Sequence, residues 1–336
     1  MGSARSRRGL RAAGVSALVL TLLLLAGCTG DGEVAAFQRA FTDDPAIQEM
    51  ELTSHDNQPF TGGVSGDVVA RSGLSDDEAV RLVGRLSDYT RENRDRMQGR
   101  VTLAVDGIQL SIAGDDELDV RAAHLLTVLR ADGRVVSAFL GERALGVTGD
   151  GAPAAIGMAG DLPDMIDGMV PGLSEGLRVR SADGAVDIGG GAITRGAALR
   201  LWHALQPDVA LTGIRVRDDA RIVVTLQREA DLTRAERAVA REGFDEGTKV
   251  VFASDLVRLG EADGEEARAL LAKLSDHARA RIAWVWTSGA RIEVAVRAEV
   301  DIAVMAAEVE AALPAAVDEA SLRWEGDPDT RTAIRP

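Results

Sequence analysis

Apolar and polar residues alternate along several short segments of the chain, and this period of two predicts half-buried β-strands. The segments come in pairs joined by short turns, among which Asp106-Gly107 is a strong two-residue hairpin signal. Asp183-Gly184, Asp218-Asp219 and Ser288-Gly289 play the same part further along the chain. The predicted strand pairs are 47–53 with 65–70, 101–105 with 108–112, 177–180 with 186–188, 214–217 with 222–226, and 282–286 with 292–296.

Amphipathic helices are predicted between these strand pairs. Ser75 and Glu78 form the sequence signature of a capping box ahead of an apolar stripe that starts at Ala79. Further helices are predicted near 34–41, 119–130, 162–173, 194–205, 231–241, 265–279 and 300–313, and a further strand at 135–140. From Ser75 on, helix starts recur roughly every 40 residues, which is the size of one strand–strand–helix unit.

This order predicts an α+β protein built from tandem helix–strand–strand–helix–strand modules. Grouping the same elements from the strands instead would give ferredoxin-like units, and the sequence leaves both groupings open. The predicted organisation is a signal peptide at 1–27, a lipidated cysteine with a short tether at 28–33, modules at 34–117, 118–191, 192–260 and 261–325, and a frayed tail at 326–336.

The module order resembles the BON domains of bacterial envelope proteins. The segments that carry the resemblance are 101–112, 120–129 and 135–140, and again 177–188, 197–205 and 209–216. The resemblance implies exported α+β modules that contact membrane lipid or envelope partners without catalysis. It is a resemblance of pattern across about two thirds of the chain rather than of one diagnostic motif.

The first residues have the three parts of a bacterial export signal. Arginines lie at the start, an apolar run covers 15–25, and Leu25-Ala26-Gly27-Cys28 closes it. An apolar run this short does not comfortably span a bilayer, which needs about 20 residues. The ending resembles a lipobox, which implies that Cys28 receives a diacylglyceryl thioether and palmitate-type acylation. The segment Ser6 to Leu10 also resembles a twin-arginine signal, so the export route stays open.

Composition places the rest of the chain among globular proteins, with 46% hydrophobic and 27% charged residues. The length of 336 residues predicts two or more domains. The net charge is −15, and because residues 1–27 hold four arginines and no acid, 34 basic residues remain against 53 acidic ones in residues 28–336, a charge of −19. Such a charge repels phosphate backbones and excludes nucleic-acid binding as the main role.

Few residues suggest catalytic or metal chemistry. Cys28 is the only cysteine, and the four histidines have no zinc-binding spacing. His124 and His203 fall within predicted helices, where we expect partly buried, hydrogen-bonded imidazoles. Asp115-Asp116-Glu117 is the least improbable calcium site, although capping of the next helix explains it better. Gly189-Gly190-Gly191 is interpreted as a turn. We therefore predict no metal site, no cofactor and no assigned catalytic residue.

Arginines on two predicted strands form a first candidate binding surface. Arg178 with Arg180, and Arg215 with Arg217, alternate with apolar residues and should share the polar face of one sheet, where Arg221 would join them. One interpretation is a strip that recognises carboxylates or phosphates of the cell wall. The alternative is cross-strand ion pairing with Asp187 and Asp218.

Tryptophans near the end of the chain form a second candidate surface. Trp284 and Trp286 share a strand face, and Trp324 follows on a later strand. Exposed, they would stack on sugars or on a partner protein. Ile282, Ile292, Val294 and Val296 are expected to continue the same apolar face, so core packing is the alternative.

Together these features favour a lipid-anchored protein on the extracytoplasmic face of a bacterial cell membrane. The favoured role is a non-catalytic binding or scaffold protein, with the membrane reached through its anchor and peptidoglycan or an envelope protein as partner. Two alternatives stay open: a cell-wall hydrolase or transferase that uses paired carboxylates, and a carrier with a small-ligand pocket between modules.

Overall fold

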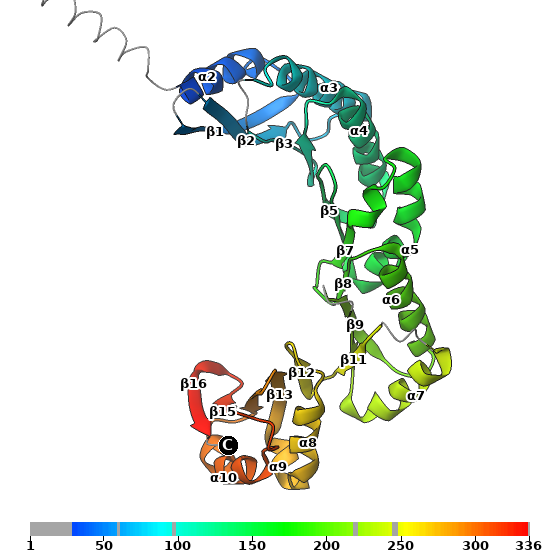
Figure 1. The fold of residues 1–336 in the computed structure, drawn as a ribbon, viewed down its shortest axis with the longest axis vertical. Helices are drawn as coiled ribbons and strands as arrows, with labels where there is room; N and C mark the ends of the chain where they lie inside the picture. Colours follow the sequence, from blue (N-terminus) through cyan, green and yellow to red (C-terminus); the bar gives the residue numbers. More distant parts are fainter. Residues whose placement is uncertain (1–28, 59–60, 96–98, 218–220, 244–247, 335–336) are drawn as a thin grey trace, which may run out of the picture. The chain divides into compact units, whose positions relative to one another are not determined.

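The structure is a computed structural model that describes residues 29–58, 61–95, 99–217, 221–243 and 248–334. The chain divides into two compact units (Figure 1). The first comprises residues up to Leu145 together with Ile166–Leu173, and the second comprises Gly146–Met165 and the residues from Ser174 onward. Cys28, the apolar run and the arginines before it lie outside the described residues.

The first unit begins with α2 (Thr29–Phe41), the hairpin β1 (Ile47–Gln58) and β2 (Thr61–Ala70), and α3 (Asp76–Glu92). It continues with β3 (Val101–Val105), β4 (Ile108–Ile112), α4 (Asp116–Ala131) and β5 (Val135–Leu140). Helices α3 and α4 pack side by side and bury their apolar stripes against the strands (Figure 1). Phe37, Phe41 and Tyr89 join α2 to α3 with ring centroids 4.8–5.4 Å apart.

The Asp-Gly hairpin signal is confirmed in the turn between β3 and β4. Both turn residues have positive φ, 45° at Asp106 and 84° at Gly107, as a tight two-residue hairpin requires. Arg130 ties this turn to the start of α3, because its guanidinium donates to Asp106, to Asp76 and to the carbonyl oxygen of Leu74. The turn is thus bonded directly to the helical layer.

The second unit begins with β6 (Leu145–Gly149) and α5 (Gly151–Met169), which both lie partly in the first unit. It continues with β7 (Leu177–Ser181), β8 (Val186–Ile188), α6 (Ala192–Leu205), β9 (Leu211–Val216), β10 (Ile222–Leu226), α7 (Leu232–Glu242) and β11 (Val250–Ala253). It ends with β12 (Val257–Leu259), α8 (Glu265–Lys273), α9 (Asp276–Arg281), β13 (Ile282–Ser288), β14 (Arg291–Val296), α10 (Asp301–Ala312), β15 (Glu319–Trp324) and β16 (Asp327–Ile334). Helices α8, α9 and α10 pack against β12–β16 around a core that includes Leu270, Val285 and Leu322.

Within the described ranges the strands form two sheets, one of 11 strands and one of five, in which the strands follow one another in chain order. Strands joined by a short turn pair antiparallel, as in β7–β8 and β13–β14, and β9 and β10 also pair antiparallel. Strands joined by a helix pair parallel, as in β2–β3, β8–β9 and β14–β15. This alternation of hairpin and crossover confirms a mixed α+β architecture.

Several of the described elements differ from the sequence-based prediction. Strands β6, β11 and β12 were not predicted, and α2 already begins at Thr29, within the predicted tether. The helix expected at 162–173 begins at Gly151, so that Pro163 lies inside it. The helix expected at 265–279 is divided at Leu274, because Ser275 caps a new helix by accepting a hydrogen bond from the amide of Ala278. The frayed tail is a wrong prediction for 327–334, which form β16 and pair antiparallel with β15. The predicted turn at Asp218-Asp219 lies outside the described residues.

Candidate anion-binding site

Arginines gather on one face of three neighbouring strands in the second unit. Strand β8 lies between β7, which it pairs antiparallel, and β9, which it pairs parallel. The register places Arg180 opposite Asp187, and Asp187 opposite Arg215. The flanking residues of β7, Leu177 and Val179, are buried on the other face, where the helices pack. The two predicted arginine pairs therefore do share a sheet face, which we call the arginine face (Arg178, Arg180, Asp187, Arg215, Arg217).

Asp187 is the acid at the centre of the arginine face. Its two carboxylate oxygens accept hydrogen bonds from Arg178 at 2.6 and 2.7 Å, and Arg180 approaches the first of them at 3.4 Å. Partial burial raises the pKa of Asp187, but the hydrogen bonds and charges of Arg178 and Arg180 outweigh it, so the pKa of Asp187 is lowered. Asp187 is therefore a fixed negative charge at neutral pH, and the predicted cross-strand pairing is confirmed for this residue.

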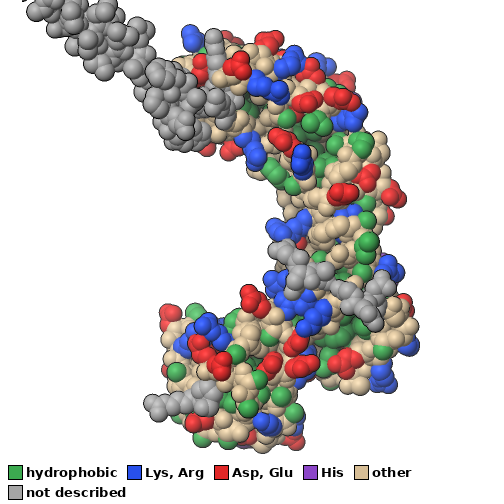
Figure 2. Space-filling view, in the orientation of Figure 1, with side chains coloured by type: hydrophobic (Ala, Val, Ile, Leu, Met, Phe, Trp, Pro, Cys, Tyr) green, Lys and Arg blue, Asp and Glu red, His purple; other side chains and the backbone are tan. Residues whose placement is uncertain are grey.

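The remaining arginines give the face an excess of positive charge. Arg215 is exposed and donates to the carbonyl oxygen of Gly184 at 2.8 Å, which leaves its charge unneutralised. Arg217 is exposed at the end of β9. Among the described residues of this face, the guanidinium groups of Arg178, Arg180, Arg215 and Arg217 and the carboxylate of Asp187 sum to +3, on a chain whose overall charge is −15. Asp218 and Asp219, which follow Arg217, lie outside the described residues. Figure 2 shows Lys and Arg side chains gathered beside these strands.

Arg221 does not belong to the arginine face, and its prediction as a member is wrong. It is only 7% exposed. Its guanidinium donates to the carbonyl oxygens of Glu261 and Ala262, in the segment that leads into α8. The expectation failed because the alternation was extended across the turn into β10, whereas Arg221 precedes the first residue of that strand.

Trp284 and Trp286 share a strand face, as predicted, but Trp284 is not an exposed stacking surface. It is 3% exposed, and its ring lies between the guanidinium groups of Arg258, at 4.3 Å, and Arg323, at 4.6 Å. Because these two cations cover the ring, a sugar cannot stack on it. Trp286 is half-buried beside it. Trp284 is thus buried, but the core partners predicted for it are wrong. It packs with Ala283 and Ala295, whereas Ile282, Ile292, Val294 and Val296 belong to the separate core under α8 and α10.

Trp324 lies on the opposite side of the same sheet from Trp284. Its strand, β15, buries Ala320 and Leu322 in the core under the helices, and residues two apart share a face. Trp324 pairs in register with Val296, another core residue, and its ring lies against Gly326. The three tryptophans therefore form no common aromatic surface.

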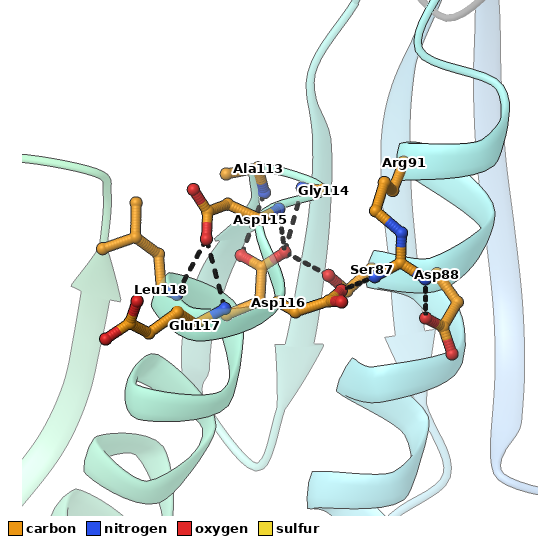
Figure 3. A network of polar contacts seen from close by, with 10 residues as sticks. Ser87, Asp88, Arg91, Ala113, Gly114, Asp115, Asp116, Glu117 and Leu118 are labelled. Carbon is orange, nitrogen blue, oxygen red and sulfur yellow. Dashed lines mark hydrogen bonds and ion pairs between the residues drawn. The ribbon is translucent and has the colours of Figure 1, made fainter.

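The acidic segment at the start of α4 is a helix cap (Figure 3). Asp115 accepts hydrogen bonds from the amides of Glu117 and Leu118, which confirms the capping interpretation. Sequence reasoning missed Asp119, which is 2% exposed and accepts hydrogen bonds from Ser87 Oγ and from the amides of Ala113, Gly114 and Asp115. It joins α3, the end of β4 and the start of α4. Nothing in the sequence distinguishes Asp119 from its acidic neighbours.

Other candidate residues take structural roles. Gly190 has a φ of 87° in the turn before α6, which confirms the turn interpretation of the three glycines. His124 and His203 are exposed, contrary to the expectation of partly buried imidazoles, because each lies on the solvent side of its helix. Within the described ranges no group of three His, Cys, Asp or Glu side chains is arranged to hold a metal ion.

Paired carboxylates with separated pKa values would mark a hydrolase. Where a shift is resolved among the described carboxyl groups, the pKa is lowered, as at Glu78 and Glu308, whose carboxylates accept hydrogen bonds from serine amides. In the same part of the chain, no helix is long and apolar enough to cross a bilayer. No protein-family model matches the chain, and no curated protein sequence matches it significantly.

Proposed function

We propose that this chain is a bacterial lipoprotein of the cell envelope that binds an anionic partner without catalysing a reaction. The observation that carries the proposal is the arginine face of β7–β9. Arg180 and Arg215 flank Asp187 in register across three strands, and the face has an excess of positive charge on an acidic chain. Guanidinium groups bind carboxylates and phosphates through two parallel hydrogen bonds.

The partner is the peptidoglycan of the wall, or an envelope protein with an acidic surface. Peptide stems of the wall present carboxylates, which fit a row of guanidinium groups separated by the strand spacing of about 4.8 Å. Asp187 reduces the repulsion among the arginines and fixes the orientation of Arg178. The remaining donors of Arg180 and Arg215 are the groups that contact the partner.

The anchor in this proposal is the lipidated Cys28, which holds the chain at the extracytoplasmic face of the cell membrane. Two or three acyl chains hold a protein stably in a bilayer, whereas one does so only marginally. The BON-like interpretation of the modules agrees with this location. Helices cover one face of the strands and leave the alternate residues of β7, Arg178 and Arg180, exposed on the other.

The proposal is tested by co-sedimentation of residues 29–336 with purified peptidoglycan and with anionic vesicles in parallel. Pelleting with peptidoglycan that declines as salt rises from 50 to 500 mM is the expected result, because exposed charge pairs are screened. Pelleting with vesicles alone would replace the wall by lipid as the partner. Pelleting with neither would reject the wall-binding proposal.

A further inference from the structure

The first unit contains a groove of about 580 Å³ whose walls are mostly charged. It is formed by the last turn of α2, the segment from Asp43 to Ala46, the residue after β2, and the first turns of α3. Its basic side chains are Arg39, Arg71, Arg81 and Arg85. None of them belongs to the arginine face of the second unit.

Part of this charge is already committed to bonds within the groove. Arg85 donates to both oxygens of Asp44 at 2.9 and 3.0 Å, and the amide of Ala46 completes the contacts of that carboxylate. The carboxylate of Glu78 accepts hydrogen bonds from the amide and the hydroxyl of Ser75, both at 2.8 Å. Arg85 therefore neutralises Asp44, whereas Glu78 keeps its negative charge. Both Ser75 hydrogen bonds reach Oε2 of Glu78; they lower the pKa of Glu78 most, and the charges of Arg71 and Arg81 lower it further.

The other cations keep donors that face the groove. Arg39 uses only its Nε, which donates to the carbonyl oxygen of Ala35. The guanidinium groups of Arg71 and Arg81 form no hydrogen bond or ion pair with any residue in the part of the chain that the structure describes. Apart from the Arg85–Asp44 pair, three cations against the carboxylates of Asp43 and Glu78 leave the groove with a charge of +1.

We propose that this groove binds a phosphate group through Arg39, Arg71 and Arg81. These guanidinium groups come from three different elements, α2, the end of β2 and α3, so they approach one ligand from several directions. A tetrahedral phosphate offers oxygens in several directions, whereas a carboxylate is satisfied by a single guanidinium fork. The Ser75 capping box holds the Glu78 carboxylate at the start of α3, where its charge offsets part of the charge of Arg71 and Arg81.

The phosphate can belong to a soluble phosphate compound or to a phospholipid headgroup. The headgroup source rests on the proposed function, because it needs the lipid anchor at Cys28. Helix α2 begins at Thr29, the residue after Cys28, and Arg39 lies about 15 Å further along the helix at 1.5 Å per residue. A tether at Cys28 would keep the groove within one helix length of the bilayer.

The first test is calorimetric titration of the full chain, in neutral detergent, with inorganic phosphate. The paired variant Arg71→Gln with Arg81→Gln is compared with Arg94→Gln, an exposed arginine of the same unit outside the groove. We expect the paired variant to weaken phosphate binding at least tenfold and Arg94→Gln to leave it within twofold. No binding by the unaltered chain up to 20 mM phosphate, or equal loss in both variants, would overturn the proposal.

The second test identifies the source of the phosphate. The full chain is placed in phosphatidylcholine nanodiscs with and without phosphatidic acid, and backbone hydrogen exchange is followed at residues 71–85. Slower exchange with phosphatidic acid, absent in the paired variant, assigns the headgroup. Unchanged exchange alongside groove-dependent binding of inorganic phosphate assigns a soluble phosphate. Slower exchange with phosphatidic acid does not require binding to peptidoglycan. The experiment therefore separates a chain that fails to bind the wall from a groove that fails to bind phosphate.

Discussion

Asp187 of β8 accepts one hydrogen bond on each carboxylate oxygen from the guanidinium of Arg178 on β7, at 2.6 and 2.7 Å. This two-point contact holds Arg178 flat against the sheet. It also places a negative charge between Arg180 and Arg215, which would otherwise face each other across three strands with only repulsion between them. The pair thus organises the arginine face.

The contribution of this pair to folding should depend on pH. Because the pKa of Asp187 is lower in the folded than in the unfolded chain, the pair's stabilisation is present above the unfolded value of about 3.9 and is lost as the pH falls through the folded value. Asp187→Asn should cost about 1–2 kcal/mol at pH 7. Urea unfolding at a series of pH values measures the difference from the unaltered chain.

That difference should be constant above about pH 5 and shrink as the pH falls below about 4. Asp164→Asn, which removes an exposed carboxylate from α5, is the control and should change stability by less than about 0.5 kcal/mol. A cost for Asp187→Asn that grows toward acid pH would contradict the account of this pair.

Asp119 should be among the most sensitive single positions of the first unit. Asp119→Ala removes the acceptor of Ser87 Oγ and of three backbone amides in a buried position, and each buried donor left without a partner costs about 1–3 kcal/mol. We expect a total loss of about 3 kcal/mol or more by urea unfolding. Asp116→Ala, which removes an exposed partner of Arg91, should cost at most about 1 kcal/mol. Equal costs would show that the buried network is not what stabilises this helix start.

Trp284 should behave as a core residue. Trp284→Ala should lower the free energy of unfolding by about 3–5 kcal/mol, because it removes a buried ring and the two cation–π contacts from Arg258 and Arg323. Trp286→Ala, at a half-buried position of the same strand, should cost less. Thermal or urea unfolding followed by far-ultraviolet circular dichroism compares the two. A nearly neutral Trp284→Ala would indicate that the ring serves binding and not packing.

Acylation of Cys28 can be tested by metabolic labelling. Cells that express the full chain and are fed an alkyne analogue of palmitate should label the protein, and Cys28→Ala should abolish the label because Cys28 is the only thiol of the sequence. The unaltered chain should fractionate with membranes. Label retained in Cys28→Ala would remove the lipobox interpretation.

Local sequence signals predicted most of the strands and helices because their causes are local. The Asp106-Gly107 turn, the Ser75 capping box and the alternation of β7 each depend on residues only a few positions apart. Helix α5 was predicted to begin too late, because proline is favoured in the first turn of a helix and Pro163 therefore suggested a start there. Strand β16 was missed because its polar residues suggest a tail, and only pairing with β15 makes it a strand.

In the candidate sites, too, features with local causes were predicted and contacts between distant segments were not. Alternation correctly placed Arg178, Arg180 and Arg215 on one face, since period two is a property of the strand itself. It could not show that Arg221 turns toward Glu261 or that Arg258 and Arg323 cover Trp284, because these contacts join segments about 25 to 40 residues apart. The groove of the first unit likewise depends on three elements that only the fold brings together.

The most direct test of the central claim is peptidoglycan co-sedimentation of residues 29–336 carrying Arg180→Gln and Arg215→Gln. The matched control carries Arg200→Gln and Arg237→Gln, which remove the same charge from exposed positions of α6 and α7. We expect the first variant to lose at least tenfold in wall affinity and the control to stay within twofold of the unaltered protein. Equal affinities for the unaltered protein and the first variant would contradict binding through the arginine face.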